Sequence, residues 1–202
     1  MIRYSATAAH NNIKQMDTVI MALAPEGFTS TQKNIINVLL VFSVWFACVL
    51  GGTLWSWVAV VIFFAVYQYA IGSLHKEWLC ILTIAAIGFS VDYTISSLQL
   101  MIYTDTNTLA FIPSLIALPG WMAALWLAVA TLFLHGFQCL HHRPLLAVVV
   151  GIILGPAIYY MTSLLNGVKL GMILTSFFLC YGLLWGIMMP LFGNISRSLV
   201  HE

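Results

Sequence analysis

The stretch from residue 35 to residue 73, IINVLLVFSVWFACVLGGTLWSWVAVVIFFAVYQYAIGS, decides the fold class of this chain. It contains two apolar runs, Ile35 to Gly51 and Leu54 to Ser73, and neither run holds a charged residue. A membrane-spanning helix needs about 20 mostly apolar residues, because lipid offers no hydrogen-bond partner to an open backbone. The Gly51-Gly52-Thr53 triplet between the runs is a turn signal. The stretch therefore predicts a helical hairpin that crosses a bilayer twice.

Four further apolar runs follow this hairpin: Trp78 to Met101, Ala117 to Phe137, Leu145 to Leu165 and Leu170 to Pro190. Of the 202 residues, 62% are hydrophobic and 6% are charged, whereas about a quarter of an average soluble domain is charged. The runs are continuous, unlike the alternating segments of about ten residues that build an outer-membrane barrel. We therefore expect an all-α polytopic membrane bundle of about six transmembrane helices.

The basic residues indicate how these spans are oriented. Six of the seven Lys and Arg residues fall on one side of the expected membrane: Arg3, Lys14, Lys33, Lys76, Arg143 and Arg197. The seventh, Lys169, falls on the opposite side. Because cytoplasmic segments carry the excess of Lys and Arg, we expect both termini in the cytoplasm and a multi-pass protein of the inner membrane.

This topology divides the chain into three parts. Residues 1–33 form a cytoplasmic N-terminal segment, residues 34–192 the six-helix transmembrane domain, and residues 193–202 a short cytoplasmic tail. Within the first part, Met16, Ile20 and Leu23 share one face at helical spacing. Residues 11–24 therefore fit a short helix on the inner leaflet, and fit a loosely ordered tail equally well.

Several classes of function find no support in the composition. Net charge is +1 and the basic residues are scattered singly, so nucleic acid is not expected as a partner. No phosphate loop, dinucleotide fingerprint or GxSxG elbow occurs, and we expect no cofactor. The cysteines form no CxxC pair and are interpreted as small packing residues: Cys48, Cys80, Cys139 and Cys180. Expected partners are membrane lipids and, as a further candidate, another membrane protein.

Asp92 lies near the middle of the third run, where an acidic group costs about 2.5–3.5 kcal/mol on insertion scales. We therefore expect it to face protein or water. Ser96 and Gln99 lie one and two turns further on and extend a polar stripe from it. The carboxyl group fits a proton relay, a general acid or base, or part of a head-group site, and fits a structural bond between helices as well.

Counting about 1.5 Å per residue from the cytoplasmic helix ends places Asp92, Tyr159 and Cys48 at a similar depth, in the outer half of the bundle. Tryptophans from other runs enter the same layer. This predicts a pocket lined by Asp92, Trp45, Cys48, Trp121, Trp126 and Tyr159. The alternative is that the aromatic residues anchor the chain at the membrane interface without any ligand.

His135, His141 and His142 gather at the cytoplasmic end of the fourth run, beside Arg143. No carboxylate is near them in the sequence, so we do not predict a metal site. Imidazole and guanidinium groups at this level are typical of a helix end that lies among phospholipid head groups.

The fifth run carries a signal for close helix packing. Gly151 and Gly155 form a GxxxG pair that would let another helix approach closely. Pro156 follows directly and predicts a bend or a freed carbonyl group.

Four sets of residues together resemble an uncharacterised bacterial family called domain of unknown function 2878. They are the run from Asn37 to Gly51, Asp92, Pro119 to Trp126 with His135, and Gly155 to Tyr159. The resemblance spans about residues 36 to 190. It implies a small bacterial inner-membrane protein that acts as an accessory partner in envelope lipid modification or stress response. The residues themselves leave two alternatives open: an intramembrane lipid-binding protein or enzyme that uses the pocket around Asp92, and a small proton-coupled carrier.

Overall fold

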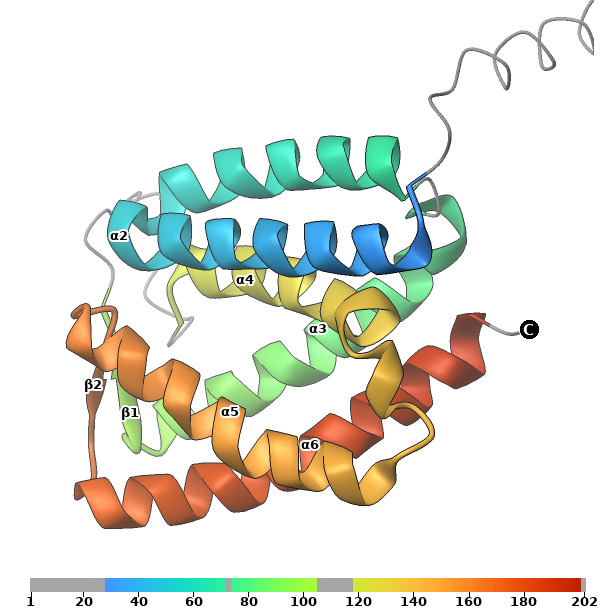
Figure 1. Cartoon of the computed structure of the whole chain (residues 1–202). Helices are drawn as coiled ribbons and strands as arrows, with labels where there is room; N and C mark the ends of the chain where they lie inside the picture. The colour runs from blue at the N-terminus through green and yellow to red at the C-terminus, as the bar shows by residue number, and fades with distance from the viewer. Residues whose placement is uncertain (1–27, 72–73, 105–117, 201–202) are drawn as a thin grey trace, which may run out of the picture.

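A computed structural model describes residues 28–71, 74–104 and 118–200, which form a helical bundle with a small two-stranded sheet at one end (Figure 1). The segment for which an interfacial helix was considered, residues 11–24, lies outside the described residues. The elements follow in the order α2 (Ser30–Ala70), α3 (Leu74–Ser97), β1 (Met101–Tyr103), α4 (Gly120–Thr131), α5 (Pro144–Leu164), β2 (Val168–Leu170) and α6 (Leu174–Val200). Helix α4 continues into a π-helical turn, η1 (Leu132–Gly136), and a 3-10 turn, η2 (Gln138–Leu140).

Helix α2 reverses its direction at Gly52, so that its two halves lie antiparallel in Figure 1. Gly52 has φ 67° and ψ −166°, a backbone conformation that glycine adopts without the clash a side chain would cause. Lys33 in the first turns of α2 donates a hydrogen bond to the carbonyl group of Ile71, just beyond its end, at 3.4 Å. The predicted break at Gly51-Gly52-Thr53 is therefore confirmed.

Four helices of the described part are long and apolar enough to cross a membrane: α2, α3, α5 and, in α6, Leu174–Leu199. The apolar stretch Gly120–Gly136 is shorter. Much of the outer surface is apolar, and Leu145 exposes 82% of its area. A soluble monomer rarely shows such continuous apolar surface, so the fold agrees with the expected all-α membrane bundle.

The ends of two expected spans differ from the sequence prediction. Met101 and Leu170 were counted as helical, but they face each other in the antiparallel pair of β1 and β2, whose register also opposes Tyr103 to Val168. Gln99, with φ 57°, leaves the helical conformation directly after α3. Asn166, with φ 61°, does the same between α5 and β2. The turns and the strands contain apolar residues, so apolar composition alone extends the expected helices across them. The strands were therefore not predicted.

Helices α5 and α6 pack closely through the predicted small residues. A Cβ atom added at Gly151 would lie 2.2 Å from the carbonyl oxygen of Trp185, and one added at Gly155 would lie 2.1 Å from Cγ of the same residue. Both glycines and Pro156 are buried. The GxxxG pair therefore brings α5 against the backbone and the indole ring of Trp185.

A Gly151→Ala substitution is expected to lower the free energy of unfolding by about 1–3 kcal/mol, because backbone atoms of α6 would have to move away. Gly182→Ala on the facing helix is the control, since its added Cβ would lie 3.4 Å from the nearest atom. Unfolding of the purified chain in detergent, titrated with sodium dodecyl sulfate, measures both variants. Equal midpoints for the two would contradict the close approach.

Candidate functional site

The carboxyl group of Asp92 is the centre of a hydrogen-bonded cluster of four side chains. Tyr103 donates to Oδ1 at 2.8 Å, and Trp126 donates from Nε1 to Oδ2 at 2.6 Å. The hydroxyl group of Tyr159 lies 2.7 Å from Oδ1 and 2.9 Å from Oδ2. Asp92 itself is 1% exposed. We call these four residues the Asp92 cluster.

The cluster joins four elements of the fold. Asp92 is on α3, Tyr103 on β1, Trp126 on α4 and Tyr159 on α5. Burial raises the pKa of the Tyr103 hydroxyl well above its usual range, so this hydroxyl keeps its proton and donates to the carboxyl group. Each of the three donors is neutral. Asp92 therefore fixes the relative positions of three aromatic side chains that come from different parts of the sequence.

Packing around Trp126 leaves its indole ring little freedom to turn. A Cβ atom added at Gly88, one turn before Asp92 on α3, would lie 2.3 Å from two ring carbons of Trp126. Trp185 of α6 stacks on the same ring, with centroids 5.9 Å apart and an angle of 7° between the planes. The glycine and the stacked ring hold the indole N–H in line with Asp92.

The remaining residues of the predicted pocket lie in the same layer but bond to other partners. Trp45 donates from Nε1 to the hydroxyl oxygen of Thr162 on α5 at 3.1 Å. The Cys48 thiol lies 3.6 Å from the carbonyl oxygen of Trp121. The Trp121 indole in turn donates to the carbonyl group of Thr104 at 3.1 Å. These contacts tie α2 to α5 and α4, and they contain no direct bond to Asp92.

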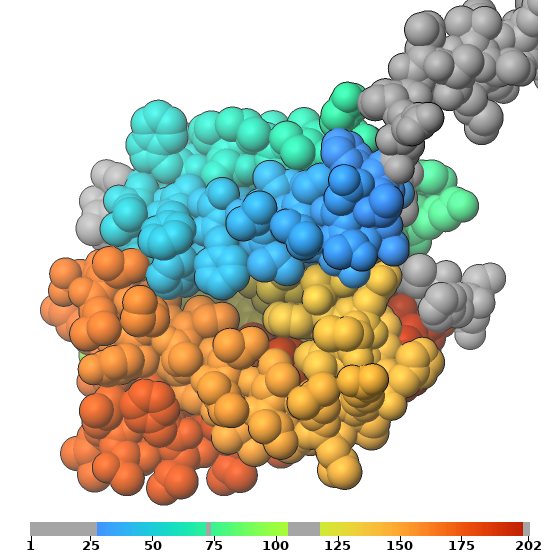
Figure 2. All heavy atoms as spheres, viewed as in Figure 1, coloured from blue at the N-terminus to red at the C-terminus, as the bar shows by residue number. Residues whose placement is uncertain are grey.

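A long apolar groove of about 390 Å³ runs between the first half of α2, α4 with η1, and α5. Figure 2 shows this face hollowed between the blue and orange segments, with the olive and yellow atoms of α4 deep inside. At one end it is lined by Tyr103 and Trp121, and toward the other by Phe133 and Phe137. Phe137 lies 16 positions after Trp121, which corresponds to a length of about 24 Å at 1.5 Å per residue. We call this feature the apolar groove.

All three donors of the Asp92 cluster line the apolar groove, whereas Asp92 lies behind them. Trp45 also lines the groove, and Cys48 does not. Four of the predicted pocket residues therefore line one cavity: Trp45, Trp121, Trp126 and Tyr159. Tyr103 belongs with them and was missed by the sequence reading. Hydrogen bonds from Tyr103, Trp126 and Tyr159 connect Asp92 to the lining of the groove.

The expected polar stripe beyond Asp92 stops at Ser96, which is buried on α3. Gln99 lies in the turn after the helix, where its side chain donates to the carbonyl group of Ser96 at 3.3 Å. The left-handed backbone of Gln99 ends the helical spacing on which the stripe depended.

A second polar cluster lies at the opposite end of α3 and was not predicted. Nε2 of His135 lies 3.1 Å from Oε1 of Glu77, and the Tyr67 hydroxyl donates to Oε2 of Glu77 at 2.5 Å. The side chains of His135 and Glu77 are only 11% and 5% exposed. A carboxylate that is distant in the sequence therefore lies beside the histidine group in space, which the sequence did not predict. We call these three residues the Glu77 cluster.

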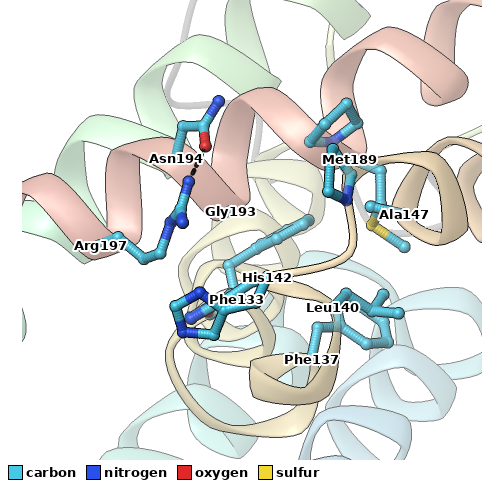
Figure 3. A pocket seen from close by; sticks show the side chains of 12 residues that line it. Phe133, Phe137, Leu140, His142, Ala147, Met189, Gly193, Asn194 and Arg197 are labelled. Atoms are coloured by element: carbon cyan, nitrogen blue, oxygen red, sulfur yellow. Dashed lines mark hydrogen bonds between the residues drawn. The ribbon is translucent and has the colours of Figure 1, made fainter.

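Two of the other predicted head-group residues line a pocket of about 360 Å³ at the same end of the bundle (Figure 3). His141 and His142 line it, together with Asn194 and Arg197 from α6. Nε2 of His141 lies 2.7 Å from the carbonyl oxygen of Phe133 and 3.2 Å from Oγ of Ser196. Arg143 is exposed and precedes α5. We call this cavity the basic pocket.

Within residues 28–71, 74–104 and 118–200, no set of three or more His, Cys, Asp and Glu side chains comes together in a way that could hold a metal ion. The four cysteines are free thiols, with Cys48 and Cys80 buried and Cys139 and Cys180 exposed.

A family model described as "Protein of unknown function (DUF2878)" matches residues 34–191. The match contains the Asp92 cluster, the apolar groove and the Glu77 cluster, and it ends before Arg197. No curated protein and no solved structure matches the chain.

Proposed function

The chain belongs to the family of proteins of unknown function DUF2878, and for it we propose a role in holding lipid: an integral membrane protein that binds one lipid tail in the apolar groove. The observation that supports this most directly is the groove itself, which combines a volume of about 390 Å³ with a nearly continuous apolar lining. Ligand cavities in proteins typically measure about 300–1,000 Å³ and are mostly apolar with a few placed polar groups.

The proposal includes six spans. The two halves of α2, then α3, α4 with η1, α5 and α6 would cross the bilayer in turn, with both termini on the side that carries six of the seven basic residues. In this frame the groove runs along the bilayer normal. Its length of about 24 Å compares with a hydrocarbon core of about 30 Å, so an extended acyl chain would fit along it. We propose the bacterial inner membrane as the location.

The arrangement of polar groups favours tail binding over the alternatives. The hydroxyl and indole groups that border the groove at Tyr103, Trp126 and Tyr159 all donate to Asp92. A tail would therefore meet the faces of these aromatic rings, with their polar atoms already bonded. In a proton-coupled carrier the Asp92 carboxyl group would have to leave three donors on three elements during each cycle. We therefore favour a stationary Asp92 that shapes the groove wall.

A protein that holds lipid suits the accessory role in envelope lipid modification that the family resemblance implies. It would present the bound lipid to a separate enzyme in the same membrane. We propose this as its cellular task, and recovery of a stoichiometric partner by affinity purification from native membranes would support it. A clean monomer under gentle extraction would count against it.

Filling the groove tests the proposal. Ala157 lines the groove on α5, so Ala157→Phe is expected to lower by about tenfold the amount of lipid that stays bound to the purified chain. Ala86→Phe makes the same change at an exposed position on α3 outside the groove and serves as the control. Native mass spectrometry of the chain released from detergent measures bound lipid directly. Equal lipid retention in both variants would overturn the proposal.

A further inference from the structure

The basic pocket and the apolar groove lie next to each other and share part of their lining. Phe133 and Phe137, from η1 and the residue that follows it, line both cavities, and so does Met189 of α6. We propose that the lipid in the groove is an anionic phospholipid whose phosphate group binds in the basic pocket, between Arg197 and His142. This inference rests on the proposed function, because it names the class of lipid that the groove would hold.

Arg197 provides the strongest argument for an anion. Its Nη2 donates to Oδ1 of Asn194, one turn earlier on α6. Its Nε is buried, and no residue of the described part accepts a hydrogen bond from it. An unpaired buried donor is costly, and more so when it is charged. A phosphate oxygen would satisfy this donor, and the planar guanidinium group matches phosphate geometry.

The opposite wall of the pocket adds a second donor. His141 is engaged with Phe133 and Ser196, so it holds η1 against α6. His142 is exposed at the same cavity, and Figure 3 shows it on the loop that faces the α6 residues Asn194 and Arg197. Among the described residues that line the pocket, none is acidic. The charge of the pocket is therefore complementary to an anion.

The position of the pocket selects a lipid phosphate over a free one. The pocket lies at the end of the bundle where α6 finishes and α5 begins, the level of the exposed Arg143. Basic side chains at this level lie among phospholipid head groups. A tail that starts at this level would enter the groove past Phe133 and Phe137, the apolar residues that both cavities share. The proposed phosphate site and the proposed tail site therefore lie next to each other, as the head group and the tail of one lipid molecule do.

The test compares two lipids that differ only in the head group. The full chain in neutral detergent is incubated with equal amounts of dioleoyl phosphatidylglycerol and dioleoyl phosphatidylcholine, and native mass spectrometry measures which lipid stays bound. We expect a preference of roughly tenfold for phosphatidylglycerol in the unchanged protein and its loss in Arg197→Gln. Lys76→Gln, which removes an exposed charge outside the pocket, should keep the preference.

The outcomes separate this inference from the proposed function. If both lipids bind equally and Ala157→Phe removes both, the tail site stands and the phosphate site is overturned. If Ala157→Phe leaves binding of both lipids unchanged, the proposed function fails, whatever Arg197→Gln does. A third arm adds inorganic phosphate alone: displacement of phosphatidylglycerol at equal concentration would indicate a site for a free anion and would overturn the lipid assignment.

Discussion

An Asp92→Ala substitution is expected to destabilise the protein by about 2–5 kcal/mol, because it removes the shared acceptor of one buried donor, Trp126, and two partly buried ones, Tyr103 and Tyr159. Polar bonds between membrane helices contribute about 0.6 to 1.7 kcal/mol each, and three of them end on this carboxyl group. Unfolding of the purified chain by sodium dodecyl sulfate in mixed micelles measures the loss as a lower midpoint.

Two further substitutions show whether the loss comes from the cluster. Asp92→Asn keeps one carbonyl oxygen as an acceptor, so we expect it to lose less stability than Asp92→Ala. Ser90→Ala removes an exposed hydroxyl group on the same helix that donates to the carbonyl oxygen of Ala86, and it should leave the midpoint unchanged. A midpoint for Asp92→Ala equal to that of Ser90→Ala would contradict the role of the carboxyl group.

The same substitution connects stability to the groove. Tyr103, Trp126 and Tyr159 would lose their common anchor, and each of them lines the groove. We therefore expect Asp92→Ala to retain less lipid than Asp92→Asn at a detergent composition in which both are folded. This difference would identify Asp92 as a positioning residue for the groove wall.

The features that the sequence predicted are the local ones. Apolar run length predicted the helices, and two adjacent glycines predicted the reversal of α2 at Gly52. The insertion cost of an acid singled out Asp92, and counting rise per residue placed Tyr159 at its depth. These inferences rest on the length and polarity that a lipid surrounding would impose on each candidate span.

Tyr103 could not be found in this way, because its place depends on contacts between distant segments. A left-handed residue, Gln99, turns the chain after α3, and pairing of β1 with Val168–Leu170 then brings Tyr103 back toward Asp92. No periodicity in the sequence encodes that return.

Glu77 was not predicted as part of a site, for a different reason. It lies directly before Trp78, where the third apolar run was expected to begin, whereas α3 begins at Leu74. Once the helix is extended to that start, Glu77 shares its buried face with Ile81, Ile84 and Asp92 at helical spacing. The helical spacing of these buried residues is visible in the sequence, but it includes Glu77 only when the helix is taken to begin at Leu74.

The Glu77 cluster is expected to contribute as much to stability as the Asp92 cluster does. Removing one partner leaves the other buried without its counterpart, which costs about 1–3 kcal/mol and more where the remaining group is charged. We therefore expect Glu77→Ala and His135→Ala each to lower the free energy of unfolding by about this amount. Tyr67→Phe removes only the hydroxyl donor and should cost about 1–3 kcal/mol.

A double-mutant cycle distinguishes a coupled pair from two separate packing defects. If Glu77 and His135 stabilise the fold through their 3.1 Å contact, the double variant should lose clearly less than the sum of the two single losses. Lys76→Ala, at the exposed neighbour of Glu77, controls for changes at the start of α3 and should be close to neutral. Because His135 lies in the π-helical turn η1, a strong coupling would mean that this turn is held in place by α3. Additive losses would instead mean that Glu77 and His135 act independently and that other packing holds η1.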